Sequence, residues 1–469
     1  MLGAVLFFAI LWLADFPKPT IDDLFYCGAG LNLAGGGDLS NPLLIRQGFP
    51  SHYFFVYPPL QSYLLAGWLR VFGVSAASVL ALHAAAFVVI ACSAIVILRR
   101  NGAPAFLEWL APLGVSAAFL SPGLRPEAFS VALVMAGFAL YEISVGPRFM
   151  VTFLSFALIF LGGSAAPRMT PFTGMLAACL VLGFFLGPGA DENLRTLRLA
   201  AVGTALVFAG LVFLVLIHFR LGEFLQTFRL HATRVTGVRL WQLKIFFRPI
   251  TGVRQWPILA VAAALFVVCF RNPDTNLRRL GLAAGVGFPL GALLGALGHG
   301  SAWFASLIIL VLGAPVLAGL SRTGRLALGG LFLAVFLVAN TTTFVLMGGM
   351  LSGKVKFHDP PRADVLAIRS SSEHPALVDS AVARYTFDFR LPQGFIDWNY
   401  SAPFPGMNAV FDKINLPDLY LLGPGTVMYL ESYGRLNLPV ETWTPLGLRN
   451  WSSCRDPGQV FLVPATEIK

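Results

Sequence analysis

The chain has 469 residues, of which 57% are hydrophobic and only 12% carry a charge. An average soluble protein has about a quarter charged residues, so this composition excludes an ordinary soluble enzyme and a disordered chain. The formal net charge is +10, but the Lys and Arg residues stand between long apolar runs, which argues against nucleic-acid binding. Apolar runs separated by basic turns are typical of a polytopic α-helical membrane protein.

Apolar runs recur along the first 350 residues. A helix needs about 20 apolar residues to cross a bilayer. The sequence predicts about eleven membrane helices, over 1–16, 76–98, 105–121, 128–145, 149–164, 170–187, 199–219, 256–270, 280–298, 301–320 and 326–348. The first run lacks the basic start and the cleavage site of a signal peptide, so we interpret it as a membrane anchor.

Arginine residues occupy alternate turns between these predicted helices. The turns after the even-numbered helices contain Arg99, Arg100, Arg148, Arg195, Arg198, Arg271, Arg278, Arg279, Arg322 and Arg325. Basic residues in short loops favour the cytoplasmic side of a membrane. This rule predicts a cytoplasmic N-terminus and an inner-membrane protein whose long segments 17–75, 220–255 and 351–469 are extracytoplasmic.

The composition changes after Ser352, where apolar residues thin out and Asp, Pro, Ser and Asn return. Residues 385–390 alternate between apolar and polar side chains, which predicts a strand with one buried face. We therefore predict a transmembrane domain over 1–350 and a small extracytoplasmic α/β domain over 351–469.

The first external segment contains an acidic pair, Asp22 and Asp23, directly after the first predicted helix. Acids beside a membrane are costly to desolvate, which makes them candidates for function. One carboxylate can act as a general base towards an acceptor hydroxyl, and its charged neighbour would raise its pKa. Alternatively, the pair forms the first turn of a helix that Thr20 caps. Both interpretations remain open from the residues alone.

Three other external turns contain candidate ligands for an anion. Arg125 can bind a phosphate with two hydrogen bonds, or it can form an interfacial salt bridge with Glu127. Arg168 in the next external turn can hold an anionic ligand or extend to lipid headgroups. His299 can donate to a phosphate or transfer a proton, or it can simply hydrogen-bond within its own turn.

The segment 220–255 contains seven Lys or Arg residues, including Arg234 and Arg239, and one acid, Glu223. This excess predicts an amphipathic, interfacial helix that meets anionic lipid or a lipid-linked phosphate. A cytoplasmic position would also explain the charge, but it would break the alternation of the remaining turns.

These features share an order with a known class of enzymes. An acidic pair after the first helix is followed by a Gly-rich stretch, a helix start at Tyr57-Pro58-Pro59-Leu60, an Arg-Pro-Glu turn, a basic turn, a late His turn and a C-terminal external domain. This order resembles the GT-C class of integral-membrane glycosyltransferases, in the branch of protein O-mannosyltransferases and lipid A aminoarabinose transferases. The resemblance covers roughly residues 1–350.

The resemblance implies transfer of a sugar from a polyprenyl-phosphate donor to an acceptor hydroxyl, with inversion at the anomeric carbon. Asp22 and Asp23 match the family's catalytic acid pair, whose first acid is the base. The expected lipid-phosphate and donor site consists of Arg125, Glu127, Arg168, His299, Arg234 and Arg239. Tyr57, Pro58 and Pro59 are expected in the substrate loop.

The resemblance leaves several properties of this chain open. The acceptor can be a glycan, a lipid or a protein, and the Arg-Pro-Glu turn departs from the aminoarabinose enzymes, so the sugar is also open. No cofactor is firmly predicted, because some branches of the class use a divalent cation and others do not. The alternative is a transporter or flippase for a lipid-linked or small solute, although such proteins commonly show inverted repeats, and none is evident here.

Overall fold

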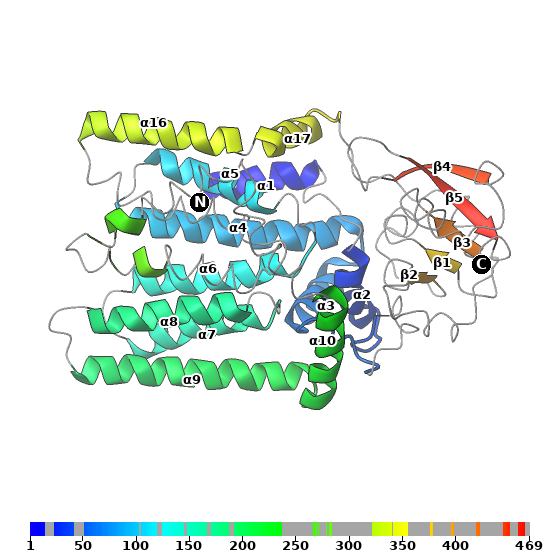
Figure 1. The fold of residues 1–469 in the computed structure, drawn as a ribbon, viewed down its shortest axis with the longest axis horizontal. Coiled ribbons are helices and arrows are strands. Elements are labelled where there is room, and N and C mark those ends of the chain that lie inside the picture. The colour runs from blue at the N-terminus through cyan, green and yellow to red at the C-terminus, as the bar shows by residue number, and fades with distance from the viewer. Residues whose placement is uncertain are drawn as a thin grey trace.

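The computed structural model describes residues 1–14, 23–41, 51–102, 105–119, 124–144, 148–166, 170–186, 192–236, 266–269, 321–339 and 341–354, a few residues between 271 and 283, and five strands beyond 375. Long helices run side by side in a bundle, and the strands lie beyond one end of it (Figure 1).

The helices of the bundle follow the apolar runs. They are α1 (Leu2–Leu13), α4 (Ala76–Arg100), α5 (Ala105–Phe119), α6 (Glu127–Ile143), α7 (Phe149–Gly163), α8 (Thr170–Leu186), α9 (Glu192–Leu216), α16 (Arg322–Ala339) and α17 (Thr341–Leu351). The predicted helices near 256–270, 280–298 and 301–320 lie almost entirely outside the described residues, so the predicted number of helices remains untested.

One predicted membrane helix is interrupted. The run 326–348 was expected as a single helix, but α16 ends at Ala339 and α17 begins at Thr341. The Thr341 hydroxyl donates to the carbonyl oxygens of Leu337 and Val338, both at 3.0 Å. Such local side-chain bonds to the backbone compete with the regular helical pattern and bend or interrupt a helix.

Among the described residues, α4 and α9 are long and apolar enough to cross a membrane. They occupy different positions in the bundle, because most of α4 is buried and most of α9 is exposed. The exposed side chains of α9 include Leu206, Val207, Phe208, Leu211 and Val215. An apolar helix surface of this kind is stable against lipid and unstable against water.

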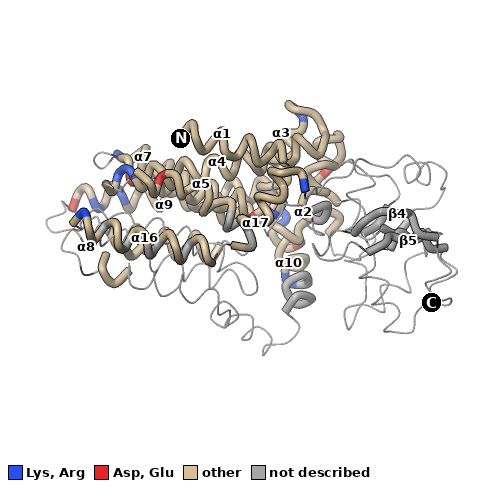
Figure 2. The backbone as a smooth tube through the Cα atoms, turned by 90° about the horizontal axis from the view of Figure 1, so that it is seen from above, with Lys and Arg blue, Asp and Glu red and all other residues tan. Residues whose placement is uncertain are grey.

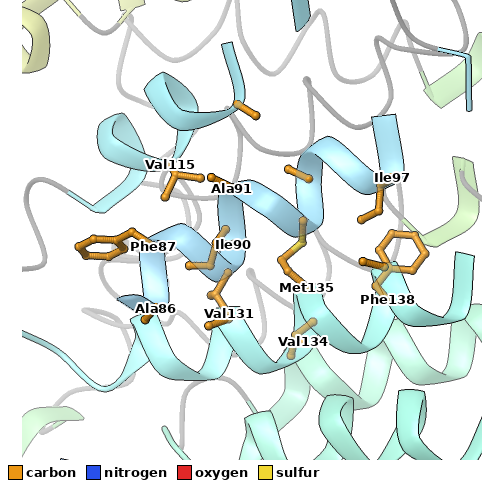
Figure 3. Close-up of a cluster of buried hydrophobic side chains, with 14 of the residues drawn as sticks. Ala86, Phe87, Ile90, Ala91, Ile97, Val115, Val131, Val134, Met135 and Phe138 are labelled. Atoms are coloured by element: carbon orange, nitrogen blue, oxygen red, sulfur yellow. The ribbon is translucent and has the colours of Figure 1, made fainter. Parts of the chain in front are cut away.

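The core of the bundle lies around α4 and its neighbour α6. Phe87 and Ile90 of α4 are fully buried, together with Val131 and Met135 of α6, as Figure 3 shows. Ala91 of α4 is also fully buried and lies next to Val115 of α5 (Figure 3). This packing holds α6 in place, including its first turn, which begins at Glu127 of the Arg-Pro-Glu motif.

The helices α6 and α7 meet along a seam of small residues. A Cβ atom at Gly137 would lie 2.4 Å from the Ser155 carbonyl oxygen, and one at Gly162 would lie 2.9 Å from the Ser130 carbonyl oxygen. The Ser130 hydroxyl donates to the Gly162 carbonyl oxygen at 2.6 Å. Small residues and interhelical hydrogen bonds of this kind hold membrane helices together.

Gly137→Ala is expected to destabilise the protein by about 1–3 kcal/mol, because the added methyl group forces the two backbones apart. Thermal unfolding of the purified protein in detergent measures the effect. Gly174→Ala in α8 is the matched control, since a Cβ atom there meets nothing within 4 Å. Equal melting temperatures for the two variants would contradict the close approach at Gly137.

The first external segment contains two helices, α2 (Asp23–Ala34) and α3 (Leu60–Phe72), that pack against each other. A Cβ atom at Gly30 would lie 2.9 Å from Leu65 Cδ2, so glycine is needed for their close contact. The predicted helix start after Tyr57-Pro58-Pro59 is confirmed, because α3 begins at Leu60 with Pro59 at its N-cap.

The amphipathic helix predicted in 220–255 is present as α10 (Leu221–Thr236). It follows α9 after a short corner and runs across the ends of the long helices (Figure 1). The corner contains two residues with positive φ, His218 at 53° and Phe219 at 58°. Left-handed backbone is unfavourable for residues other than glycine, so other contacts must hold this corner.

The C-terminal strands form one mixed sheet. They are β1 (Ala376–Val378), β2 (Phe395–Asp397), β3 (Leu419–Leu422), β4 (Thr444–Asn450) and β5 (Gly458–Pro464), in the order β2-β1-β3-β5-β4. The pairs of β1 are parallel and the pairs of β5 are antiparallel. The predicted α/β domain over 351–469 remains a prediction, because the segments that connect these strands lie outside the described residues. The strand predicted at 385–390 lies outside the described residues.

Several basic residues lie at the end of the bundle opposite α10, and others lie near α2, α3 and α10 (Figure 2). Arg99 forms a salt bridge with Glu108 at 2.7 Å, and Arg100 donates to the Glu142 carbonyl oxygen at 3.2 Å. The guanidinium groups of Arg195 and Arg198 lie over phenylalanine rings at the end of α8. The structure thus brings together arginines that the sequence predicts to be cytoplasmic, and separates them from α2, α3 and α10.

Candidate functional site

The candidate site lies at the end of the bundle nearest the sheet, where α2, α3 and α10 meet the ends of the long helices (Figure 1). The Leu60 backbone amide donates to the Ser164 carbonyl oxygen at 3.3 Å. This bond ties the first turn of α3 to the residue that follows α7. Two segments that the sequence predicts to be external, and that are about 100 residues apart in sequence, therefore lie next to each other.

Arg125 contacts the helix that begins at the acidic pair. Its guanidinium group lies 5.4 Å from the ring centroid of Tyr26, within range of a cation–π interaction. Tyr26 is buried, and its hydroxyl lies 3.2 Å from the hydroxyl of Tyr57. Tyr26 follows Asp23 by three residues, which places both on the same face of α2. The second external turn therefore meets the first turn of α2.

The acidic pair itself is described only in part. The helix α2 begins at Asp23, so this residue stands at the positive end of the helix dipole. The helix dipole stabilises an ionised carboxylate at this position, which agrees with the interpretation of the pair as a helix start. The position also suits a residue that faces a ligand, so it does not distinguish the two interpretations. Asp22 and the Asp23 side chain lie outside the described residues, so their catalytic role remains a prediction.

Glu127 is the first residue of α6 and is 1% exposed. Neither of its carboxylate oxygens has a hydrogen-bond partner among the described residues. The salt bridge considered from the sequence is therefore not formed by this carboxylate within the described part of the chain. A buried carboxylate that accepts no hydrogen bonds is unfavourable, so the Glu127 oxygens require donors that the described residues do not supply.

Two further buried polar residues lie near this end and carry no prediction from the sequence. Gln61 in the first turn of α3 is 3% exposed, and its Nε2 has no partner among the described residues. His83 of α4 donates from Nδ1 to the Val79 carbonyl oxygen at 3.0 Å and packs edge-on against Phe129. In the sequence, each of these two residues is only a single polar residue among apolar ones. Buried residues with a purely structural role show the same pattern, so the sequence did not identify them as functional.

Aromatic and basic side chains hold the corner between α9 and α10. The His218 ring stacks on Tyr53 with centroids 5.3 Å apart, and its Nε2 lies 3.0 Å from the Tyr63 hydroxyl. The Arg220 guanidinium lies 4.9 Å from the Tyr53 ring centroid. These contacts fix the two left-handed residues and join α10 to the first external segment.

Glu223 completes this connection, because it accepts hydrogen bonds from two segments. The Ser51 hydroxyl donates to Oε2 and Arg220 donates to Oε1, each at 2.9 Å. The Ser51 bond is the main cause that holds the pKa of Glu223 below the usual range, and the Arg220 charge adds to it while burial opposes it. The connection is therefore present at neutral pH and is lost as the pH falls through this lowered pKa.

Glu223→Gln is expected to speed amide hydrogen exchange in residues 221–229 by about two- to fivefold at neutral pH, since the lost ion pair is solvent-exposed. Hydrogen-exchange mass spectrometry measures this change. The control is Glu192→Gln, an exposed acid in the first turn of α9 at the other end of the bundle. An unchanged exchange rate in residues 221–229 would show that the aromatic contacts alone hold the corner.

The remaining predicted ligands are not placed. Arg168, Arg239 and His299 lie outside the described residues, and Arg234 lies on α10 without a described side chain. Within the described part of the chain, His, Cys, Asp and Glu residues form no group of three or more that suits a metal ion. The structure therefore brings together Arg125, Glu127, Tyr57 and the start of α2, and leaves the other candidates as predictions.

No family model and no curated protein sequence matches the chain. Among solved structures, it is similar to ArnT from Cupriavidus metallidurans, in a crystal structure bound to undecaprenyl phosphate. The TM-score is 0.56 and the identity 13%, over 97% of this chain and 96% of that chain. This similarity shows that the chain shares the helical fold of ArnT.

Proposed function

We propose that this protein is an inverting, membrane-embedded glycosyltransferase that uses a sugar donor linked to a polyprenyl phosphate. The observation that carries the proposal is the fold shared over nearly the full length with ArnT, whose structure contains undecaprenyl phosphate. The contact between Arg125 and Tyr26 supports it, because it brings a fixed cation to the helix that begins at the acidic pair.

The proposed reaction needs a base and a group that stabilises the departing phosphate. Asp22 or Asp23 takes the proton from an acceptor hydroxyl, whose oxygen then forms a bond with the anomeric carbon of the donor sugar. The bond between that carbon and the phosphate oxygen breaks, and the polyprenyl phosphate departs with the bonding electrons. Arg125 stabilises the negative charge that grows on the phosphate.

The amphiphilic donor fits the end of the bundle at which these residues lie. Its lipid tail remains in the bilayer, while its phosphate stays at the interface near Arg125. We assign this end to the extracytoplasmic side of an inner membrane, because the arginines of the alternate turns occupy the opposite end. Arg168, Arg234, Arg239 and His299 are further candidates for the phosphate, and Tyr57, Pro58 and Pro59 for the substrate loop.

A reconstitution assay tests the proposal. The purified protein in liposomes is incubated with radiolabelled undecaprenyl-phosphate sugars and with glycan, lipid and protein fractions of a bacterial envelope. We expect label to pass to one acceptor fraction as free undecaprenyl phosphate is released. If the donors stay intact while the liposomes translocate a lipid-linked or small solute, the protein is a transporter or flippase.

A further inference from the structure

Glu127 and Gln61 are buried side chains with unsatisfied polar atoms at the end where α3, α6 and α7 meet, and His83 Nε2 of the neighbouring α4 is a further such atom. Glu127 is 1% exposed and Gln61 is 3% exposed. Both Glu127 oxygens and the Gln61 Nε2 have no hydrogen-bond partner among the described residues. Most buried polar groups in proteins are paired, so two such residues in one region need partners from outside the described chain, either water or a ligand.

Separate contacts bring these two residues to the end of α7. Ser130, which lies one turn after Glu127 on α6, donates to the Gly162 carbonyl oxygen at 2.6 Å. Leu60, the neighbour of Gln61, donates from its amide to the Ser164 carbonyl oxygen at 3.3 Å. The first turns of α6 and α3 are thus both anchored to residues 162–164, and their buried polar atoms lie at one end of the bundle.

A phosphate is a poor partner for the Glu127 carboxylate. The two carboxylate oxygens accept hydrogen bonds, whereas an ionised phosphate also offers mainly acceptors and carries the same sign of charge. The missing group must therefore donate to Glu127. The Gln61 Nε2 needs an acceptor, which an ammonium group lacks and a hydroxyl group has. A pair of sugar hydroxyls supplies both donors and acceptors.

We propose that Glu127 and Gln61 recognise hydroxyl groups of the donor sugar, while Arg125 contacts its phosphate. This inference rests on the proposed transferase function and deepens it. It makes Glu127 a specificity-determining residue for the sugar, in place of the phosphate ligand expected from the sequence. The predicted substrate class is a polyprenyl-phosphate sugar with neighbouring free hydroxyls.

Binding measurements on the full chain in nanodiscs test this assignment. Dissociation constants are measured for undecaprenyl phosphate and for an undecaprenyl-phosphate hexose. We expect Glu127→Gln to weaken binding of the glycosylated lipid by about 10- to 100-fold, with less than about a twofold change for undecaprenyl phosphate, because one charged hydrogen-bond acceptor is lost. Gln61→Leu should act in the same direction, by about three- to tenfold.

Glu142→Gln is the matched control, since Glu142 is a buried acid on the same helix, near its other end. It should leave the ratio of the two constants unchanged. If Glu127→Gln weakens both lipids equally, or leaves the ratio at the wild-type value, the assignment to the sugar is wrong. Tighter binding of an amino-sugar donor that lacks the hydroxyl pair would also overturn it. If the wild-type protein binds neither lipid, the transferase proposal itself fails.

Discussion

Asp22→Asn or Asp23→Asn is expected to lower kcat by about 10²–10⁴-fold, because an amide cannot accept the proton of the acceptor hydroxyl. The acid that acts as the base should show the larger loss, and its neighbour a smaller one. Single-turnover transfer from a radiolabelled donor measures both rates, and donor binding should remain close to that of the wild type. The aspartate with the larger loss is then identified as the base.

The control for these variants is Asp38→Asn in the same external segment. Asp38 forms an ion pair with His52, and both side chains are largely exposed. Its loss should change kcat by less than about threefold, since an exposed ion pair contributes little. If neither Asp22→Asn nor Asp23→Asn lowers kcat more than Asp38→Asn does, the acidic pair is part of a helix start and has no catalytic role.

Arg125→Ala is expected to lower kcat/KM by about 10²–10³-fold, because it removes a cation that stabilises the departing phosphate. Arg125→Lys should recover only part of the activity, since an ammonium group lacks the planar fork that binds two phosphate oxygens. The affinity for undecaprenyl phosphate, measured separately, should be lowest for Arg125→Ala, intermediate for Arg125→Lys and highest for the wild type. The contact with the Tyr26 ring holds the guanidinium in place and is absent in the alanine variant.

Arg229→Ala is the matched control for Arg125, because Arg229 is an exposed cation on the amphipathic helix α10. It should affect activity by less than about threefold, as expected of a cation that meets only bulk lipid headgroups. Equal losses for the two variants would mean that the site responds to total surface charge, and the specific role of Arg125 would then be wrong.

The sequence was most informative where apolar runs were long. The runs behind α4 to α8 predict those helices within a few residues, because lipid and core packing both demand continuous apolar surface. A helix at the position of α2 was only one of two interpretations of the acidic pair. This helix contains Gly28 and Gly30, which lower helix propensity, and its close contact with Leu65 of α3 becomes visible only in the fold.

In the candidate site, too, the sequence predicted some features, whereas others became visible only in the fold. The sequence predicted which types of residue form the site, namely an acidic pair and an arginine in predicted external turns. It also showed the resemblance to the GT-C class. The contact of Arg125 with Tyr26 joins segments about 100 residues apart, and no local pattern specifies it. The burial of Glu127 was also hidden, since an Arg-Pro-Glu turn at a membrane surface predicts solvent exposure. Its burial results from the packing around the end of α7.

The glycine seam has a consequence for how such chains diverge. Gly137 lies ten residues after Glu127 on one uninterrupted helix. The directions in which these two residues point around the helix axis are therefore fixed relative to each other. Inserting or deleting one residue between them would turn Glu127 by about 100° around the helix axis. The length of this stretch is therefore constrained, in addition to its buried side chains such as Val131 and Met135.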